Sequence, residues 1–192
     1  MPPPELLPDE PEVLGLAATV LLARAREGAR VGADGAMIPL SEQDTQLWDT
    51  ARIARAQELS ERALAIGKAG PYQALAAIHL AYSMRLYSGE TPWRVIAKLG
   101  EGLMALRPSP VAAINQAVAL GRATTPQEGL IALEALDKDQ LEEFLPYQVA
   151  KADLSDRSGD SEAASAAFEQ ALTLDPGPAE RLYLEKRLAR LR

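Results

Sequence analysis

Side chains able to carry out catalysis are sparse in this chain of 192 residues. It has no cysteine and one histidine, His79, which excludes the usual nucleophile–base pairs and thiolate metal sites. The adjacent carboxylates Glu142 and Glu143 point to different parts of a helix surface, so they indicate solvated charge rather than a general acid–base pair. We therefore expect a protein that is not an enzyme.

Two glycine-containing segments fall short of known ligand-binding loops. Asp34-Gly35 lacks the further oxygen ligands that a calcium loop needs, and Gly100–Leu103 is too short for a phosphate cradle. We expect neither a metal nor a cofactor. His79 lies one helical turn from Tyr82 on a largely apolar segment, which favours a hydrogen-bonded core histidine over a functional one.

Composition and charge restrict the partners. Hydrophobic residues make up 47% of the chain and aromatic residues 5%, so the core is built mainly from Ala and Leu, which favour helices. The net charge of −7 opposes direct binding of nucleic acid. The longest apolar stretch, Leu14–Ala23, is about half of the roughly 20 residues that a membrane span requires. Because no secretory signal is recognisable, we expect no membrane partner and a cytoplasmic protein.

A pattern of small, large and small residues followed by proline recurs with a period of about 34 residues. Chance produces such triplets in a chain rich in Ala and Leu, but turns at the same period favour true repeats. The spacing is typical of the second helix of a tetratricopeptide repeat, where the small residue lets neighbouring helices approach. The three sets are Ala164, Phe168, Ala171 and Pro176; Gly129, Leu133 and Leu136; and Ile96, Gly100, Leu103 and Pro108.

These repeats predict an all-α protein, a tetratricopeptide-like right-handed stack of helical hairpins with about eight or nine helices. Residues 1–192 are expected to form a single domain. Pro92, Pro126 and Pro178 are expected in the first turns of helices, where a missing N–H is tolerated.

Turn signals interrupt the helical pattern near residues 31–40. Asp34-Gly35 favours a tight turn with positive φ at the glycine, and the segment after it alternates enough for a short extended arm. We expect a hairpin-like loop between helices, with Ser41 beginning the next helix.

Several stretches, in matching order over nearly the whole chain, resemble one family. That family is the C-terminal, tetratricopeptide-like extension of a group of extracytoplasmic-function RNA polymerase sigma factors of the sigma-70 family. The stretches are LLPDEPEVLGL (6–16), ARVGADG (29–35), QD with WD (43–49), GPYQ (70–73), SPVAAINQAVAL (109–120), KADLSDRSGDSEAASAAFEQAL (151–172) and AERLYLEKRL (179–188).

The resemblance implies a regulatory and protein-interaction module that modulates transcription initiation. Its implied partners are the sigma domains of the same or a related protein and the RNA polymerase core. The two DNA-binding sigma domains of that family are absent from this sequence, so we expect a chain that is N-terminally truncated relative to the family. It is either a fragment or a separately encoded relative.

The same resemblance identifies a candidate interaction loop, in which charges of both signs meet beside a tryptophan. The alternative is structural: Arg26 and Arg30 pair with Asp44 and Asp49 and only pin the loop. The candidate residues are Arg26, Arg30, Asp34, Gly35, Gln43, Asp44, Trp48 and Asp49.

A second class of function remains open, a stand-alone helical scaffold or a sensor that binds a peptide or small molecule in a concave face. Four aromatic residues are candidates to line such a groove, and a core role is the alternative for them. They are Tyr72, Tyr82, Tyr87 and Trp93.

The first expected helix is apolar on all sides, so it needs partners on both sides. The resemblance implies that one partner is missing here, because members of the family carry a further amphipathic helix just before LLPDEPEVLGL. We expect an open apolar strip to favour a homodimer through this helix or docking of a further helix. The apolar residues are Val13, Leu14, Leu16, Ala17, Ala18, Val20, Leu21 and Leu22.

Overall fold

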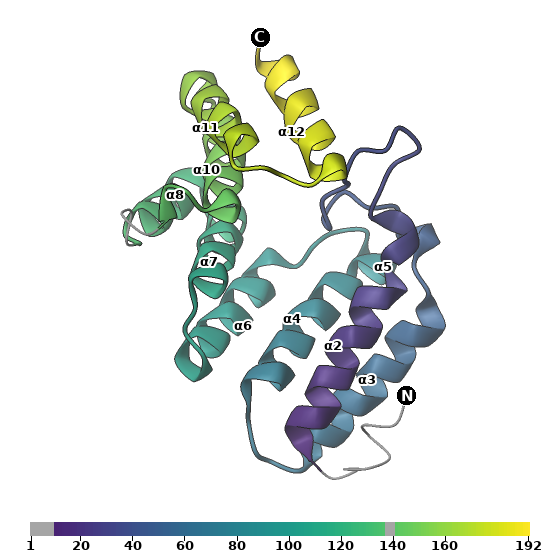
Figure 1. The fold of residues 1–192 in the computed structure, drawn as a ribbon. Coiled ribbons are helices and arrows are strands. Elements are labelled where there is room, and N and C mark those ends of the chain that lie inside the picture. The colour runs from purple at the N-terminus through teal and green to yellow at the C-terminus, as the bar shows by residue number, and fades with distance from the viewer. Residues whose placement is uncertain (1–9, 137–140) are drawn as a thin grey trace. The chain divides into compact units, whose positions relative to one another are not determined.

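Helices joined by short turns make up the computed structural model, which describes residues 10–136 and 141–192 (Figure 1). Within these ranges no strand forms, and the all-α helical stack is confirmed. Besides the single-turn α5 and two 3-10 turns, every helix there has nine or more residues. The helices are α2 (Pro11–Ala25), α3 (Thr50–Ala65), α4 (Pro71–Ser83), α5 (Arg85–Ser88), α6 (Trp93–Leu106), α7 (Pro110–Ala123), α8 (Pro126–Glu134), α10 (Leu145–Ser158), α11 (Ser161–Thr173) and α12 (Pro178–Leu191), and the 3-10 turns are η1 (Glu27–Ala29) and η2 (Thr45–Leu47).

Local sequence explains where most helices begin. Pro126 and Pro178 are the first residues of α8 and α12, as expected, because the first turn needs no proline N–H. Pro92 differs, since it is the N-cap residue and lies just outside α6. Ser109 and Asp160 accept hydrogen bonds from the N–H groups of Ala112 and Ala163 and so cap α7 and α11.

The chain divides into two compact units, a finer organisation than the one domain expected from sequence. The first unit runs to Arg30 and continues as Pro39–Arg107. Its core forms where α2 packs against α3 and α4, with α4 also contacting α6. Gly15 lets α2 approach α4 closely, because a Cβ on Gly15 would lie 2.7 Å from the backbone N of Gln73.

The second unit contains Val31–Ile38 and Pro108–Arg192. Successive helices pack on one another in it, α7 on α8, α10 on α11 and α11 on α12. The two repeat triplets in this unit face its cores. Gly129 and Leu133 are buried on α8, and Ala164, Phe168 and Ala171 are buried on α11. The periodic small and large residues of these two sets are therefore core residues of their helices.

The expected hairpin-like loop is present. Val31 and Met37 form an isolated antiparallel bridge, and Gly35 has a φ of +85°, which favours glycine. The expectation that Ser41 begins the next helix is wrong. Ser41 lies in a turn, and α3 begins at Thr50 because the Asp49 carboxylate caps it by accepting the Arg52 N–H.

The first helix is covered only in part. It packs on α3 and α4, while its residues Leu16 and Val20 remain exposed. The homodimer through this strip stays a prediction. No helix in the described ranges is both long and apolar enough to span a membrane.

Candidate functional site

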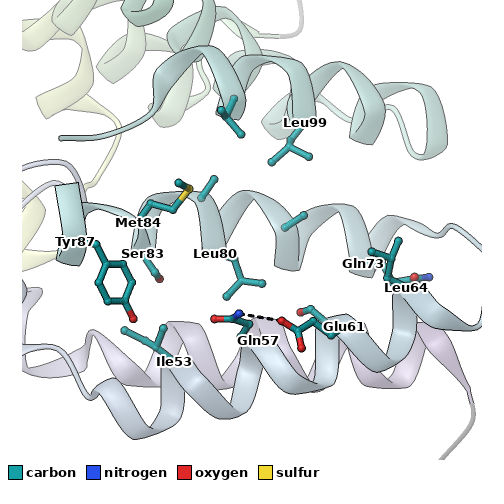
Figure 2. Close-up of a pocket in the computed structure, with 14 residues that line it drawn as sticks. Ile53, Gln57, Glu61, Leu64, Gln73, Leu80, Ser83, Met84, Tyr87 and Leu99 are labelled. Atoms are coloured by element: carbon teal, nitrogen blue, oxygen red, sulfur yellow. Dashed lines mark hydrogen bonds between the residues drawn. The ribbon is translucent and has the colours of Figure 1, made fainter. Parts of the chain in front are cut away.

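A groove of about 460 Å³ lies in the first unit, with walls from α3 and α6 and a floor from α4 (Figure 2). Figure 2 shows side chains of α3 and α4, together with Leu99 of α6 and Tyr87 of α5, around one space. The lining residues are Ile53, Gln57, Ser60, Glu61, Leu64, Gln73, Ala77, Leu80, Ala81, Ser83, Met84, Tyr87, Val95 and Leu99.

Helical spacing brings these side chains to one place. On α3, Ile53, Gln57 and Leu64 fall at i, i+4 and i+11, so they lie along one face. The floor contains Ala77 and Ala81 of α4, whose small side chains leave the space open. The groove therefore follows from the placement of alanines at the centre and longer side chains at the edges.

The rim of the groove is unusually apolar for a surface. The exposed fractions are 76% for Leu64, 50% for Met84, 84% for Tyr87 and 46% for Val95. Single exposed apolar residues are ordinary, but a group of them around one concavity marks a binding surface. Tyrosine and methionine are also enriched in protein interfaces.

Glu61 is the one charged side chain among the fourteen lining residues. Its carboxylate accepts a hydrogen bond of 2.9 Å from Gln57 Nε2. Within the described residues, no group of three or more His, Asp or Glu side chains is arranged to hold a metal ion. The side chains that line this groove, mostly apolar with one carboxylate, are suited to binding a partner or ligand.

Of the four aromatic residues expected to line a groove, Tyr87 alone does so. Tyr82 and Trp93 pack against each other edge to face with ring centroids 5.7 Å apart. The Arg107 guanidinium lies over the Tyr72 ring, 5.9 Å from the centroid of that ring. The sequence analysis missed the exposed apolar residues that surround the groove, Leu64 on α3, Met84 between α4 and α5, and Val95 on α6.

Three residues of the candidate interaction loop are not on a surface. Arg26, Gln43 and Trp48 are buried in the first unit, where the Arg26 guanidinium lies 6.0 Å from the Trp48 ring centroid. The indole N–H of Trp48 has no hydrogen-bond partner among the described residues. These three side chains serve the core, so they are unavailable for a partner.

Arg26 and His79 form a polar pair within this core. Arg26 Nη2 lies 2.8 Å from His79 Nδ1, and because arginine only donates, Nδ1 accepts and the ring proton is on Nε2. Burial, with the nearby charges of Arg26 and Arg30, lowers the pKa of His79 to about 4. Burial and Arg30 lower the pKa of Arg26 to about 10, so Arg26 stays charged at neutral pH. His79 is the hydrogen-bonded core histidine expected from sequence.

The structural alternative, in which Arg26 and Arg30 pair with Asp44 and Asp49, is wrong. Asp49 pairs with Arg52 at 2.7 Å, and Asp44 accepts the Gln46 N–H to cap η2. Arg30 donates to the Ala23 carbonyl at 3.3 Å. The acidic residues thus cap and hold their own local segments, and neither pairs with Arg26 or Arg30.

Asp34 and Gly35 belong to the second unit, where their loop contacts α12. The Asp34 carboxylate forms an ion pair with Lys186, and the Met37 N–H donates to the Ala179 carbonyl at 2.8 Å. The hydrogen bond from Lys186, followed by that from the Ala36 N–H, holds the pKa of Asp34 below its usual value. The loop is fastened to α12 by charge and backbone together.

A polar cluster in the second unit was not anticipated from sequence. Arg187 of α12 donates to Asp156 at 2.7 Å and to the Tyr183 hydroxyl at 2.6 Å. Its guanidinium also lies 5.4 Å from the Phe168 ring centroid. Burial lowers the pKa of Arg187, but the neighbouring Tyr183, Asp156 and Asp153 raise it by more. The pKa of Arg187 therefore lies above its usual value. The cluster joins α10 to α12 and has the character of a structural brace.

Comparison with known proteins yields two similarities. A family of unknown function, DUF6596, matches residues 4–64, a segment that includes α2, the loop and most of α3. The chain is 33% identical over 186 residues to the uncharacterized protein R00370 of Rhizobium meliloti (strain 1021). That alignment covers 97% of this chain and 44% of the relative, so the chain spans less than half of the relative's length. No solved structure is significantly similar.

Proposed function

We propose that this chain is a regulatory and protein-interaction module of an extracytoplasmic-function sigma factor. It modulates transcription initiation through contacts with sigma domains or with RNA polymerase. The observation that carries the interaction role is the apolar groove of α3, α4 and α6, with its exposed rim of Leu64, Met84, Tyr87 and Val95. Stacked helical hairpins commonly use such concave surfaces to bind other proteins.

Three further observations support the sigma-factor context. The ordered motifs described above resemble the C-terminal extension of these sigma factors. The matched relative is more than twice as long as its aligned part, which leaves room for additional domains in that protein. The net charge of −7 is consistent with a module that leaves DNA contacts to other domains. Action on transcription places the protein in the cytoplasm under this proposal.

Transcription in vitro tests the proposal. Core RNA polymerase and the extracytoplasmic-function sigma domains encoded nearest to this chain are assayed with and without the purified chain. We expect the chain to bind the sigma domains or the polymerase and to change transcript yield. Absence of both binding and any change in yield would contradict the proposed function.

A matched pair of variants ties that effect to the groove. Val95 and Leu106 both lie on α6 and are each 46% exposed, but Val95 lines the groove and Leu106 does not. Val95→Gln together with Tyr87→Ser should weaken binding by about fivefold or more, the usual cost of losing contacts central to an interface. Leu106→Gln should leave binding unchanged.

The alternative is a stand-alone scaffold or a sensor of a peptide or small molecule. The groove volume of about 460 Å³ favours it, because ligand sites commonly occupy 300 to 1,000 Å³. The genomic reading frame upstream of Met1 separates the two. Sigma-domain coding sequence in phase supports the sigma module, and a closed frame favours the stand-alone protein.

A further inference from the structure

The two walls of the groove differ in polarity. The α6 wall presents Val95 and Leu99, and the floor, from α4, is mainly Ala77, Leu80 and Ala81. The α3 wall is mixed, with the polar Gln57, Ser60 and Glu61 lying between Ile53 and Leu64. An occupant must therefore be apolar towards α4 and α6, and it meets polar groups in the middle of α3.

The length of the groove suits a helix. Its α3 wall extends from Ile53 to Leu64, and eleven residues at 1.5 Å each span about 16 Å. Apolar side chains at i, i+4, i+7 and i+11 of a partner helix span the same length along one face. A helix lying in such a groove is a common mode of peptide recognition.

The exposed rim argues against a small molecule. Sites for small ligands enclose about 70–90% of the ligand's surface. Here Leu64 and Tyr87 are 76% and 84% exposed, so a ligand inside the groove would leave much of both uncovered. Covering them requires an occupant with a surface of its own beyond the groove, as a protein helix has.

The charge of the groove restricts the partner further. Glu61 accepts a hydrogen bond from the neutral Gln57, and no lysine or arginine of the described chain lies within 4 Å of its carboxylate. A basic residue on the occupant would complete an ion pair there, whereas an acidic one would be repelled.

We propose that the groove binds an amphipathic helix of a protein partner that carries a Lys or Arg opposite Glu61. The apolar face of this helix packs on α4 and α6, and its basic residue faces α3. The inference deepens the proposed function, on which it rests, by stating the chemistry of the partner segment.

The test uses two designed helical peptides of about 18 residues, long enough to form several turns. Both carry leucines at i, i+4, i+7 and i+11, and they differ in one flanking position, which is Arg or Glu. Binding to the full chain is measured by fluorescence anisotropy at low salt. We expect the Arg peptide to bind about fivefold more tightly than the Glu peptide, the scale of an exposed ion pair.

Charge reversal identifies the contact. Glu61→Lys should invert the preference between the two peptides. Glu58→Lys is the matched control, because Glu58 is an exposed residue of the same helix that does not line the groove. It should leave the preference intact.

Several results would overturn the inference. They are failure of both peptides to bind, an unchanged preference in Glu61→Lys, tighter binding of dodecylamine than of either peptide, or a dimer of the chain that occupies the groove.

Titration of sigma domains with the same variants separates the two proposals. If sigma domains fail to bind but the peptides behave as expected, the sigma function fails and the inference stands. If sigma domains bind wild type, Glu61→Lys and the double variant of Val95→Gln with Tyr87→Ser alike, the inference fails and the function stands.

Discussion

His79 and Arg26 form a hydrogen-bonded pair in which Arg26 is charged and His79 is neutral at pH 7. Arg26 donates to His79 Nδ1 at 2.8 Å and also lies against Trp48. A protonated imidazole could not accept that hydrogen bond and would place a second positive charge beside Arg26. Folding therefore keeps His79 neutral, which makes the first unit sensitive to acid.

Acidification should destabilise the protein through this residue. The pKa of His79 is about 4 when folded against about 6.5 in an unfolded chain. Between these values the unfolded chain binds more protons, so lowering the pH from 6.5 to 4 favours unfolding. We expect His79 to remove about 3 kcal/mol from the free energy of unfolding over this window.

His79→Gln is the control, because its amide oxygen can still accept from Arg26 but does not titrate. Urea unfolding followed by circular dichroism at several pH values should show a shallower fall for the variant than for the wild type. Parallel curves for the two proteins between pH 6.5 and 4 would show that His79 is not responsible.

Sequence reasoning at this scale succeeded where a residue acts on its own neighbours. Gly35 has the positive φ expected of its turn, and Pro126 and Pro178 begin their helices as expected. The partners of Arg26 and Asp34 could not be anticipated, because His79 and Lys186 are far from them in sequence. For the same reason the burial of Arg26, Gln43 and Trp48 could not be read from the sequence.

At the scale of elements, α7 and α8 approach each other through two glycines. A Cβ on Gly129 would lie 2.7 Å from the Gly121 Cα and 2.9 Å from the Ala117 carbonyl oxygen. Both contacts are with backbone, which cannot move aside without shifting a helix. The small residue of the repeat pattern is thus required by helix packing.

Gly129→Ala should destabilise the second unit by about 1–3 kcal/mol through overpacking. Gly102→Ala is the control, since a Cβ there meets nothing within 4 Å and alanine stabilises a helix by up to about 1 kcal/mol over glycine. Thermal unfolding should shift in opposite directions for the two variants. A Gly129→Ala protein as stable as the wild type would refute the close-packing role.

Helices were more predictable than the groove that they form. Proline starts and periodic Leu and Ala residues are local signals, and they fall on α8, α11 and α12 as expected. The groove depends on the distance between α3 and α6, which no local signal contains. Three of the four expected groove aromatics, Tyr72, Tyr82 and Trp93, instead pack against other side chains.

At the scale of the whole molecule, each unit has its own core, and the groove belongs entirely to the first unit. The charged braces, Asp34 with Lys186 and Arg187 with Asp156, belong to the second unit. Residues of the motifs that carry the resemblance mostly make structural contacts within these two units. Glu12, for example, accepts the N–H groups of Tyr72 and Gln73 at the start of α4.

The most direct test of the central claim is hydrogen–deuterium exchange of the full chain, measured by mass spectrometry with and without the sigma domains. We expect slower exchange in the partner's presence over the segments that form the groove, in α3, in α4 and α5, and around Val95 and Leu99. Unchanged exchange throughout, or protection confined to the second unit, would contradict the claim that this groove is where the protein binds its partner.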